Sequence, residues 1–328
     1  MAAPQLLIPA IDPVLTSEIT RALPGGGRRP EAVSGAELIK LRRGLRFPLE
    51  PWSRLTPTER YRAYVAAVAQ SFDRRPVLSH ESAAALWGLP IIGPWPHEVH
   101  LLVPHASGGR SDPGIRRHAV GVPDAEVIDV GGLLVTTVSR TVVDLATTSP
   151  LMSAIAAADA ALRVPRDEGA TPLATKSELW ASWASREFRG KRRAQRVIEF
   201  AEPGAESPLE SASRVNMALA GFPRPELQHR IVVDGREYFG DFYWRDEDAW
   251  GECDGRVKYL DPNGPDPAAT AAAAYREKLR EDAIRRRVRA FTRWDATVAT
   301  SRSRLRQRLL ELGLRPRNHE PRHLHWPA

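Results

Sequence analysis

A stretch of 28 residues decides the fold of the second half of the chain: LQHRIVVDGREYFGDFYWRDEDAWGECD, residues 227–254. Three parts of it, residues 227–233, 238–244 and 249–254, are rich in β-branched and aromatic residues, a composition typical of strands. Asp234-Gly235 is a hairpin turn signal, and a charged run separates the second part from the third. The sequence therefore predicts three antiparallel strands joined by two tight turns.

The strand register places acidic residues together. If the second turn is centred between Asp246 and Glu247, then Asp241 lies directly opposite Glu252. Opposed side chains share one face of a sheet, with Cβ atoms about 4.5–5.5 Å apart, and Asp254 falls on the same face. Carboxylates this close repel one another unless a cation lies between them. We therefore expect a cation site, and the alternative is a row of solvated acids on an outward face.

The charge distribution supports a site in this part of the chain. The 328 residues hold 47 basic and 40 acidic side chains, a net charge of +7. Residues 201–269 hold 7 basic and 14 acidic side chains, whereas residues 176–200 hold 7 and 3, and residues 270–328 hold 15 and 6. An acidic segment between two basic ones is typical of a carboxylate site for divalent cations, flanked by surfaces that bind a phosphate backbone.

Several classes of protein are excluded by composition. The single cysteine, Cys253, cannot form an internal disulfide or a multi-thiolate zinc site, which favours a reducing, cytoplasmic location. No apolar run approaches the roughly 18 residues of a membrane span. The first residues lack a basic stretch and are broken by prolines, so they do not form a secretory signal.

The first 58 residues predict a winged-helix-like segment. We expect short helices over residues 14–23 and 34–41, and then a hairpin over residues 41–48 with Arg42, Arg43 and Arg46 near its tip. Arginines on such a wing contact DNA phosphates or a minor groove. An exposed basic turn without DNA contacts is the alternative.

Helices and strands alternate in the next hundred residues. We expect helices over residues 59–72, 79–88, 139–146 and 151–163, and strands over residues 99–103 and 131–136. Arg140 and Asp144 have the spacing of an ion pair on one helix face. A linker over residues 164–176, a basic helix over 177–200 and a break at Pro203-Gly204 predict the start of the last domain.

The first half resembles the antitoxin of abortive-infection toxin–antitoxin systems, the AbiEi type of actinobacteria. The resemblance covers roughly residues 14–165, and four motifs carry it: Leu41-Arg42-Arg43-Gly44, Ser79-His80-Glu81-Ser82-Ala83-Ala84, Gly88-Leu89-Pro90 and Arg140-Thr141-Val142-Val143-Asp144-Leu145-Ala146. It implies a winged helix, an α/β second domain, binding to promoter DNA and a cognate toxin as partner. The sequence departs from that pattern where the loop PGGGRRP stands in place of recognition-helix residues.

The second half, about residues 205–312, resembles the restriction-endonuclease-like PD-(D/E)xK superfamily. It looks most like the domain family related to the very-short-patch-repair endonuclease. The matching residues lie in four segments: residues 206–211, residues 241–244, residues 252–258 and the helix-strand unit over residues 276–294. The resemblance implies a mixed sheet flanked by helices and a nuclease that depends on Mg²⁺ or Mn²⁺.

The same resemblance implies roles for individual residues. Asp241 and Glu252 would hold the metal ion, with Glu210 as a further ligand through water. Asp254 stands where the superfamily has a lysine, so Lys258 or Gln228 would have to support the charge that develops on the phosphate. A basic surface beside the site would bind DNA; its arginines include Arg280, Arg285, Arg286, Arg289 and Arg293.

These inferences combine into an α/β (α+β) protein in five parts. They are a winged-helix-like segment (1–58), an antitoxin-like α/β domain (59–165), a linker with a basic helix (166–204), a restriction-endonuclease-like domain (205–315) and a disordered tail (316–328). The expected function is a metal-dependent DNA endonuclease in phage defence or DNA repair. The first alternative is a non-catalytic DNA-binding antitoxin and autoregulator with a degenerate nuclease fold. The second is a scaffold that recognises a toxin.

Overall fold

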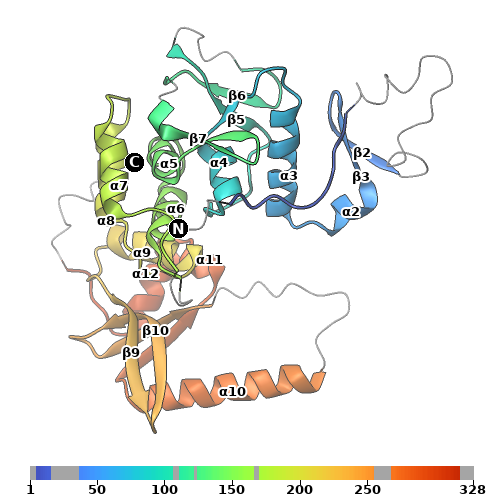
Figure 1. Ribbon diagram of the computed structural model, residues 1–328. Helices are drawn as coiled ribbons and strands as arrows, with labels where there is room; N and C mark the ends of the chain where they lie inside the picture. Colours follow the sequence, from blue (N-terminus) through green and yellow to red (C-terminus); the bar gives the residue numbers. More distant parts are fainter. Residues whose placement is uncertain are drawn as a thin grey trace, which may run out of the picture. The chain divides into compact units, whose positions relative to one another are not determined.

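The computed structural model describes residues 5–15, 37–105, 111–121, 124–165, 170–254 and 267–317. Within these residues the protein has a mixed α+β fold with three separate sheets (Figure 1). The predicted fold class is therefore confirmed. In the same residues no helix is both long enough and apolar enough to span a bilayer.

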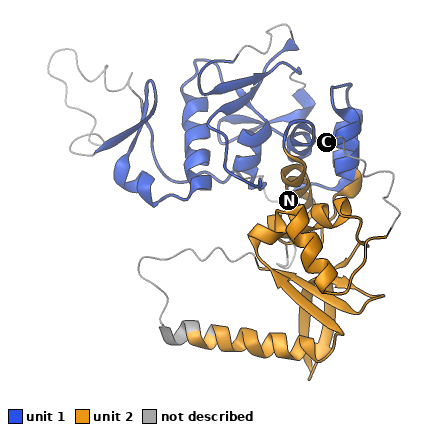
Figure 2. Ribbon diagram, turned by 180° about the vertical axis from the view of Figure 1, so that it is seen from behind, with its two compact units in different colours: residues 1–149, 173–198 blue, residues 150–172, 199–328 orange. Residues whose placement is uncertain are grey.

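The chain forms two compact units (Figure 2). Unit 1 comprises residues 1–149 and 173–198, and unit 2 comprises residues 150–172 and 199–328. The units interleave along the chain, whereas the domains expected from the sequence follow one another. Helix α6 (Leu151–Leu162), expected in the antitoxin-like domain, belongs to unit 2. Its buried Asp159 accepts hydrogen bonds from Ser211, from Arg214 and from the Glu202 N–H.

Unit 1 begins with a small antiparallel sheet in the order β1-β3-β2. Its strands are β1 (Val14–Leu15), β2 (Leu38–Arg42) and β3 (Leu45–Pro48). The predicted arginine hairpin is present, and it turns at Gly44 with φ +84°. The helix expected over residues 34–41 is wrong from Leu38 onward, because these residues pair with β3 as its edge strand. Most of the helix expected over residues 14–23 lies outside the described residues, and its first two residues form β1.

The main sheet of unit 1 is mixed, with the strand order β6-β5-β4-β8-β7. Helices precede, interrupt and follow its strands, as the alternating sequence pattern predicts. The strands are β4 (Val77–Leu78), β5 (Val99–Leu102), β6 (Ile115–His118), β7 (Val127–Val130) and β8 (Leu133–Thr136). The helices are α2 (Leu49–Arg54), α3 (Pro57–Gln70), α4 (His80–Trp87), the 3₁₀ turn η3 (Asp124–Glu126) and α5 (Val138–Thr148).

The basic helix expected over residues 177–200 is wrong as a single element. It consists of α7 (Lys176–Ala184) and α8 (Lys191–Phe200), separated by a turn that ends at Gly190 with φ +86°. A side chain at position 190 would also lie 3.3 Å from Thr147. Glycine is therefore the residue that permits this break, because other residues are strained at positive φ.

The sheet of unit 2 has the order β12-β11-β10-β9, antiparallel except for β11 and β12, which are parallel. Its strands are β9 (Glu226–Val233), β10 (Arg236–Trp244), β11 (Ala249–Cys253) and β12 (Ala290–Trp294). Its helices, besides α6, are α9 (Pro208–Leu219), α10 (Pro267–Arg285), α11 (Ala296–Ala299) and α12 (Arg302–Glu311).

The core of unit 2 lies between the sheet and the helices α9, α11 and α12. Phe242, Trp244 and Trp294 are almost completely buried in it, together with leucines of α12. Cys253 belongs to the same core, and burial raises the pKa of its thiol to about 12. The sequence pattern of the strands is thus a consequence of one apolar face packed on helices.

Candidate active site

The predicted strand register is confirmed. Phe242 pairs with Gly251, Tyr243 with Trp250 and Trp244 with Ala249. One step further along the same register, Asp241 of β10 lies opposite Glu252 of β11. The Cys253 N–H donates a hydrogen bond of 2.7 Å to Asp241 Oδ2, which fixes the carboxylate beside the end of β11.

Glu210 reaches the same place from the first turn of α9. Ser207 caps this helix by accepting a hydrogen bond from the Glu210 N–H. The Glu210 carboxylate does not complete a capping box, however, because Oε2 accepts from the Glu206 N–H at 2.8 Å and from Gln228 Nε2 at 3.4 Å. Gln228 has φ +50° and stands between the residues of β9 that pair with positions on either side of Asp241.

Asp241 and Glu210 are acidic groups held where their charge is unfavourable. Burial raises the pKa of Asp241 to about 6, and the nearby charge of Glu252 adds to the shift. Burial also raises the pKa of Glu210 to about 7, with the charge of Asp241 as the next contribution. Among the described residues, no basic side chain forms an ion pair with either carboxylate. Both groups would therefore be stabilised by a cation at this position.

Glu252 is in the opposite situation, because two arginines neutralise it. Arg280 of α10 binds both carboxylate oxygens, at 2.7 and 3.0 Å, and Arg293 of β12 binds Oε2 at 2.6 Å. Trp250 Nε1 donates to Oε1 at 3.1 Å. Burial raises the pKa of Glu252, but the hydrogen bonds and charges of the arginines outweigh burial and leave the pKa below its ordinary value.

Asp241 and Glu252 line a common pocket of about 190 Å³. Its lining includes Asp241, Glu252, Asp254 and Glu277 as carboxylates and Arg280 and Arg293 as guanidiniums. This lining carries a formal charge of −2, equal and opposite to that of one divalent cation. Asp241, Glu252 and Asp254 were expected at this site from the sequence, and Arg280 and Arg293 only on a basic surface beside it, whereas no role was expected for Glu277. Its only sequence signal is its position in the helix-strand unit that follows β11.

The donors suit Mg²⁺ or Mn²⁺, which are bound by carboxylate oxygens. Within the described residues no three His, Cys, Asp or Glu side chains are grouped as a ready-made metal site. Glu252 is bound instead by Arg280 and Arg293. Mg²⁺ is usually held by only one or two protein carboxylates and completes its shell with water and substrate phosphate. Asp241 with Glu252 or Glu210 therefore fits such an ion in charge and chemistry.

The remaining predicted site residues are distributed more widely. Lys258 lies outside the described residues. Arg285 and Arg286, at the end of α10, form ion pairs with Glu281 and Asp234. Arg289, before β12, donates its backbone N–H to Asp248 and its guanidinium Nε to the Glu247 carbonyl. They form an exposed surface whose charge is already partly balanced.

The arginine hairpin of unit 1 has its own pocket, of about 430 Å³. Arg42 and Arg43 line it together with Ser71 and Asp73 from the end of α3. Arg46 is exposed on β3, two positions after the turn at Gly44. Two arginines at an open concave surface are compatible with phosphate binding.

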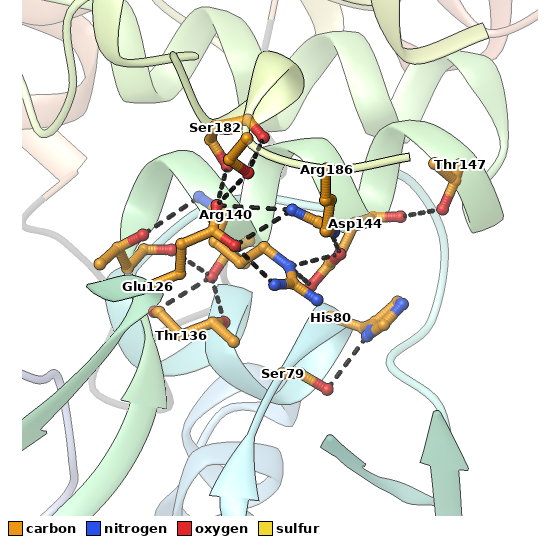
Figure 3. A network of polar contacts seen from close by, with 12 residues as sticks. Ser79, His80, Glu126, Thr136, Arg140, Asp144, Thr147, Ser182 and Arg186 are labelled. Carbon is orange, nitrogen blue, oxygen red and sulfur yellow. Dashed lines mark hydrogen bonds and ion pairs between the residues drawn. The ribbon is translucent and has the colours of Figure 1, made fainter. Parts of the chain in front are cut away.

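A second cluster of buried charges lies in unit 1 (Figure 3). Arg140 is completely buried and binds Glu126 at 2.7 Å and Asp144 at 2.9 Å. Arg186 of the segment after α7 binds the same two carboxylates, at 3.1 and 3.0 Å. The sequence predicted only the contact between Arg140 and Asp144. Glu126 and Arg186 are distant in sequence and carry no motif, so that only the fold could reveal the four-residue network.

Three histidines lie beside this network. His80 begins α4 with φ +48°, and its ring stacks on His118 with centroids 3.5 Å apart. His118 contacts His100, which in turn contacts Glu81 at 2.9 Å. Burial lowers the pKa of His118 to about 4 and holds that of His80 well below its usual value. His80 and His118 are therefore neutral packing residues at neutral pH.

Comparison with known proteins places the chain beside two mycobacterial relatives. They are the uncharacterized proteins MT2308 and Rv2248 of Mycobacterium tuberculosis, from strains CDC 1551 / Oshkosh and ATCC 25618 / H37Rv. Each is 37% identical to the chain over 145 residues, which is 41% of this chain and 50% of the relative. The chain thus spans about half the length of the curated relatives it matches. No family model and no solved structure matches it.

Proposed function

We propose that unit 2 is a metal-dependent DNA endonuclease. The observation that carries this proposal is the placement of Asp241 and Glu252 on adjacent strands, opposite each other, at a pocket whose lining has an excess of two negative charges. Glu210, in the preceding helix α9, lies close enough to Asp241 for the charge of that carboxylate to raise its pKa. Within the described residues, neither Asp241 nor Glu210 forms an ion pair with a basic side chain, although both are largely buried.

The residues of the site would divide the work of phosphodiester hydrolysis. Asp241 would hold a divalent cation with Glu252, and Glu210 would bind it through water. Such an ion activates water and stabilises negative charge on the phosphate and the leaving oxygen. Arg280 and Arg293 line the same pocket. They would support the charge that develops on the phosphate, the role expected of Lys258 or Gln228.

We also propose that unit 1 binds DNA through its arginine hairpin, in keeping with the antitoxin resemblance. Arg42 and Arg43 line an open pocket, and Arg46 is exposed on the neighbouring strand. A cognate toxin is a further proposed partner. The nuclease unit would then act on DNA that unit 1 holds.

The test is cleavage of plasmid and duplex oligonucleotides with Mg²⁺ or Mn²⁺, comparing the wild type with Asp241→Asn. Loss of a metal-binding carboxylate should lower the rate by at least the roughly 10–100-fold seen when outer-shell partners of a metal are removed. Asp246→Asn is the matched control, since Asp246 lies in the turn after β10 and pairs with exposed Arg317. Cleavage that persists in Asp241→Asn would refute the site assignment.

One observation favours a second candidate function, a non-catalytic DNA-binding regulator. Glu252 is already bound by two arginines, and Asp254 stands where the superfamily has lysine. A degenerate nuclease fold would retain such a closed carboxylate. The same assay separates the two functions, because a regulator binds the duplex and leaves it intact at every metal concentration.

A further inference from the structure

Two guanidinium groups hold the carboxylate that the proposed nuclease needs for its metal ion. Glu252 accepts four hydrogen bonds, two from Arg280, one from Arg293 and one from Trp250. A carboxylate has about four acceptor positions, so these contacts use its full capacity. Glu252 can ligate a metal ion only if at least one arginine leaves it.

Both arginines are placed so that they can leave. Their side chains are 29% and 27% exposed, whereas that of Glu252 is 8% exposed. Glu277 binds both of them, and Arg280 also donates to the Phe239 carbonyl, so that alternative partners hold them at the pocket wall. A DNA phosphate entering this pocket would meet two guanidiniums whose planar fork suits bidentate contacts with phosphate.

We propose that Arg280 and Arg293 form a latch that couples metal binding to DNA binding. In the absence of DNA they occupy Glu252 and weaken metal binding. When DNA binds they transfer to a backbone phosphate, which releases Glu252 to the divalent cation. The inference rests on the proposed function, because it takes DNA as the ligand of this site. It goes beyond that function by making the metal site incomplete until substrate is present.

The latch predicts an unusual effect on metal affinity. Removing a ligand's neighbour from a metal site normally weakens binding, whereas removing a latch arginine should strengthen it. We expect Mn²⁺ to bind Arg293→Gln or Arg280→Gln on the order of tenfold more tightly than the wild type without DNA, a coupling of ordinary size. The measurement is calorimetric titration of the full-length protein with Mn²⁺ alone.

The matched control is Arg245→Gln. It removes one positive charge from the same unit, at an exposed pair with Glu226 that does not line the pocket. Its Mn²⁺ affinity should stay within about twofold of the wild type, because exposed charges at a distance are screened by salt. Arg280→Lys keeps the charge but loses the bidentate fork, so it should bind Mn²⁺ with intermediate affinity and provides a second variant if Arg280→Gln does not fold.

A second titration measures the coupling itself, with a saturating 20-base-pair duplex that carries phosphorothioates to resist cleavage. The duplex should raise the Mn²⁺ affinity of the wild type and of Arg245→Gln by about 5–150-fold. The rise should be several-fold smaller in Arg280→Gln and Arg293→Gln, in which Glu252 is already partly released.

Each outcome has a distinct meaning. Mn²⁺ affinity that is unchanged or lower in both latch variants would overturn the latch, and the arginines would then serve only to attach α10 and β12 to β11. If the duplex raises the Mn²⁺ affinity but DNA is not cleaved, the nuclease proposal is refuted and the latch stands. If DNA is cleaved but the duplex does not change the Mn²⁺ affinity, the latch alone is refuted. If the wild type does not bind Mn²⁺ with or without the duplex, both proposals are refuted.

Discussion

The two clusters of charged residues, Arg140 with its partners in unit 1 and the pocket of unit 2, differ in their charge balance. In unit 1, Arg140 and Arg186 face Glu126 and Asp144, so two positive charges match two negative ones. In unit 2, the pocket has two guanidiniums against four carboxylates. The charges of the first cluster are balanced, whereas the lining of the second has an excess of two carboxylates. Charge balance thus separates a structural network from a candidate active site more clearly than the number of charged residues does.

Replacing Arg140 should have the largest effect among the substitutions that test this difference between the two clusters. Arg140→Met would leave Glu126 and Asp144 buried beside a single remaining arginine. Removing one partner of a buried ion pair costs about 3–5 kcal/mol, so we expect unit 1 to lose about that much free energy of unfolding. Denaturant unfolding of the variant measures the loss. A change below about 1 kcal/mol would show that the network does not stabilise unit 1.

The two units should also respond to pH with opposite signs. The pKa of His118, about 4, lies below its unfolded value of about 6.5. The contribution of His118 to the stability of unit 1 is therefore full at neutral pH and is lost as the pH falls from about 6.5 to 4. At about 1.4 kcal/mol per pKa unit, this loss is on the order of 3 kcal/mol at most. His118→Asn should flatten the pH dependence of the stability of unit 1.

In unit 2 the pKa values of Asp241 and Glu210, about 6 and about 7, lie above those of the unfolded chain. Their contribution to stability is therefore full at low pH and is lost as the pH rises from about 4 to 7 in metal-free protein. Segment-resolved hydrogen exchange across this pH range follows both units in one sample. Parallel pH profiles for the two units would contradict the comparison.

Neutral substitutions in unit 2 should have the reverse effect of Arg140→Met. In metal-free protein, Glu210→Gln removes a carboxylate that burial and Asp241 disfavour, while its amide oxygen can still accept from the Glu206 N–H. We expect the free energy of unfolding at pH 8 to rise by about 1 kcal/mol, the order of one pKa unit. Thermal unfolding with a chelator present measures it, and destabilisation would show that Glu210 already has a cationic partner.

The smallest effect is expected at an exposed pair. Arg245 and Glu226 interact at 2.7 Å on the surface of unit 2. Exposed pairs contribute about 0–1 kcal/mol, so Arg245→Gln should change the free energy of unfolding by less than about 1 kcal/mol. A larger loss by denaturant unfolding would mean that exposure is a poor guide to the energy of ion pairs in this protein.

Local chemistry explains what could be predicted. The Asp234-Gly235 turn and the charged turn after Trp244 determine the strand register, and that register places Asp241 opposite Glu252. The caps at Ser207 and Gly88 depend in the same way on a few neighbouring residues. The helix expected near residue 38 failed because its apolar spacing also suits a strand, and pairing with β3 decided between them.

The sequence alone determined that Asp241 and Glu252 would meet, because a hairpin relates residues that are close along the chain. Only the tertiary structure decided how those acids are neutralised. Arg280 and Arg293 reach Glu252 from a helix and a parallel strand 28 and 41 residues further on, and Arg186 reaches Asp144 from another segment 42 residues away. Such contacts depend on how whole elements pack, which no local pattern of residues specifies.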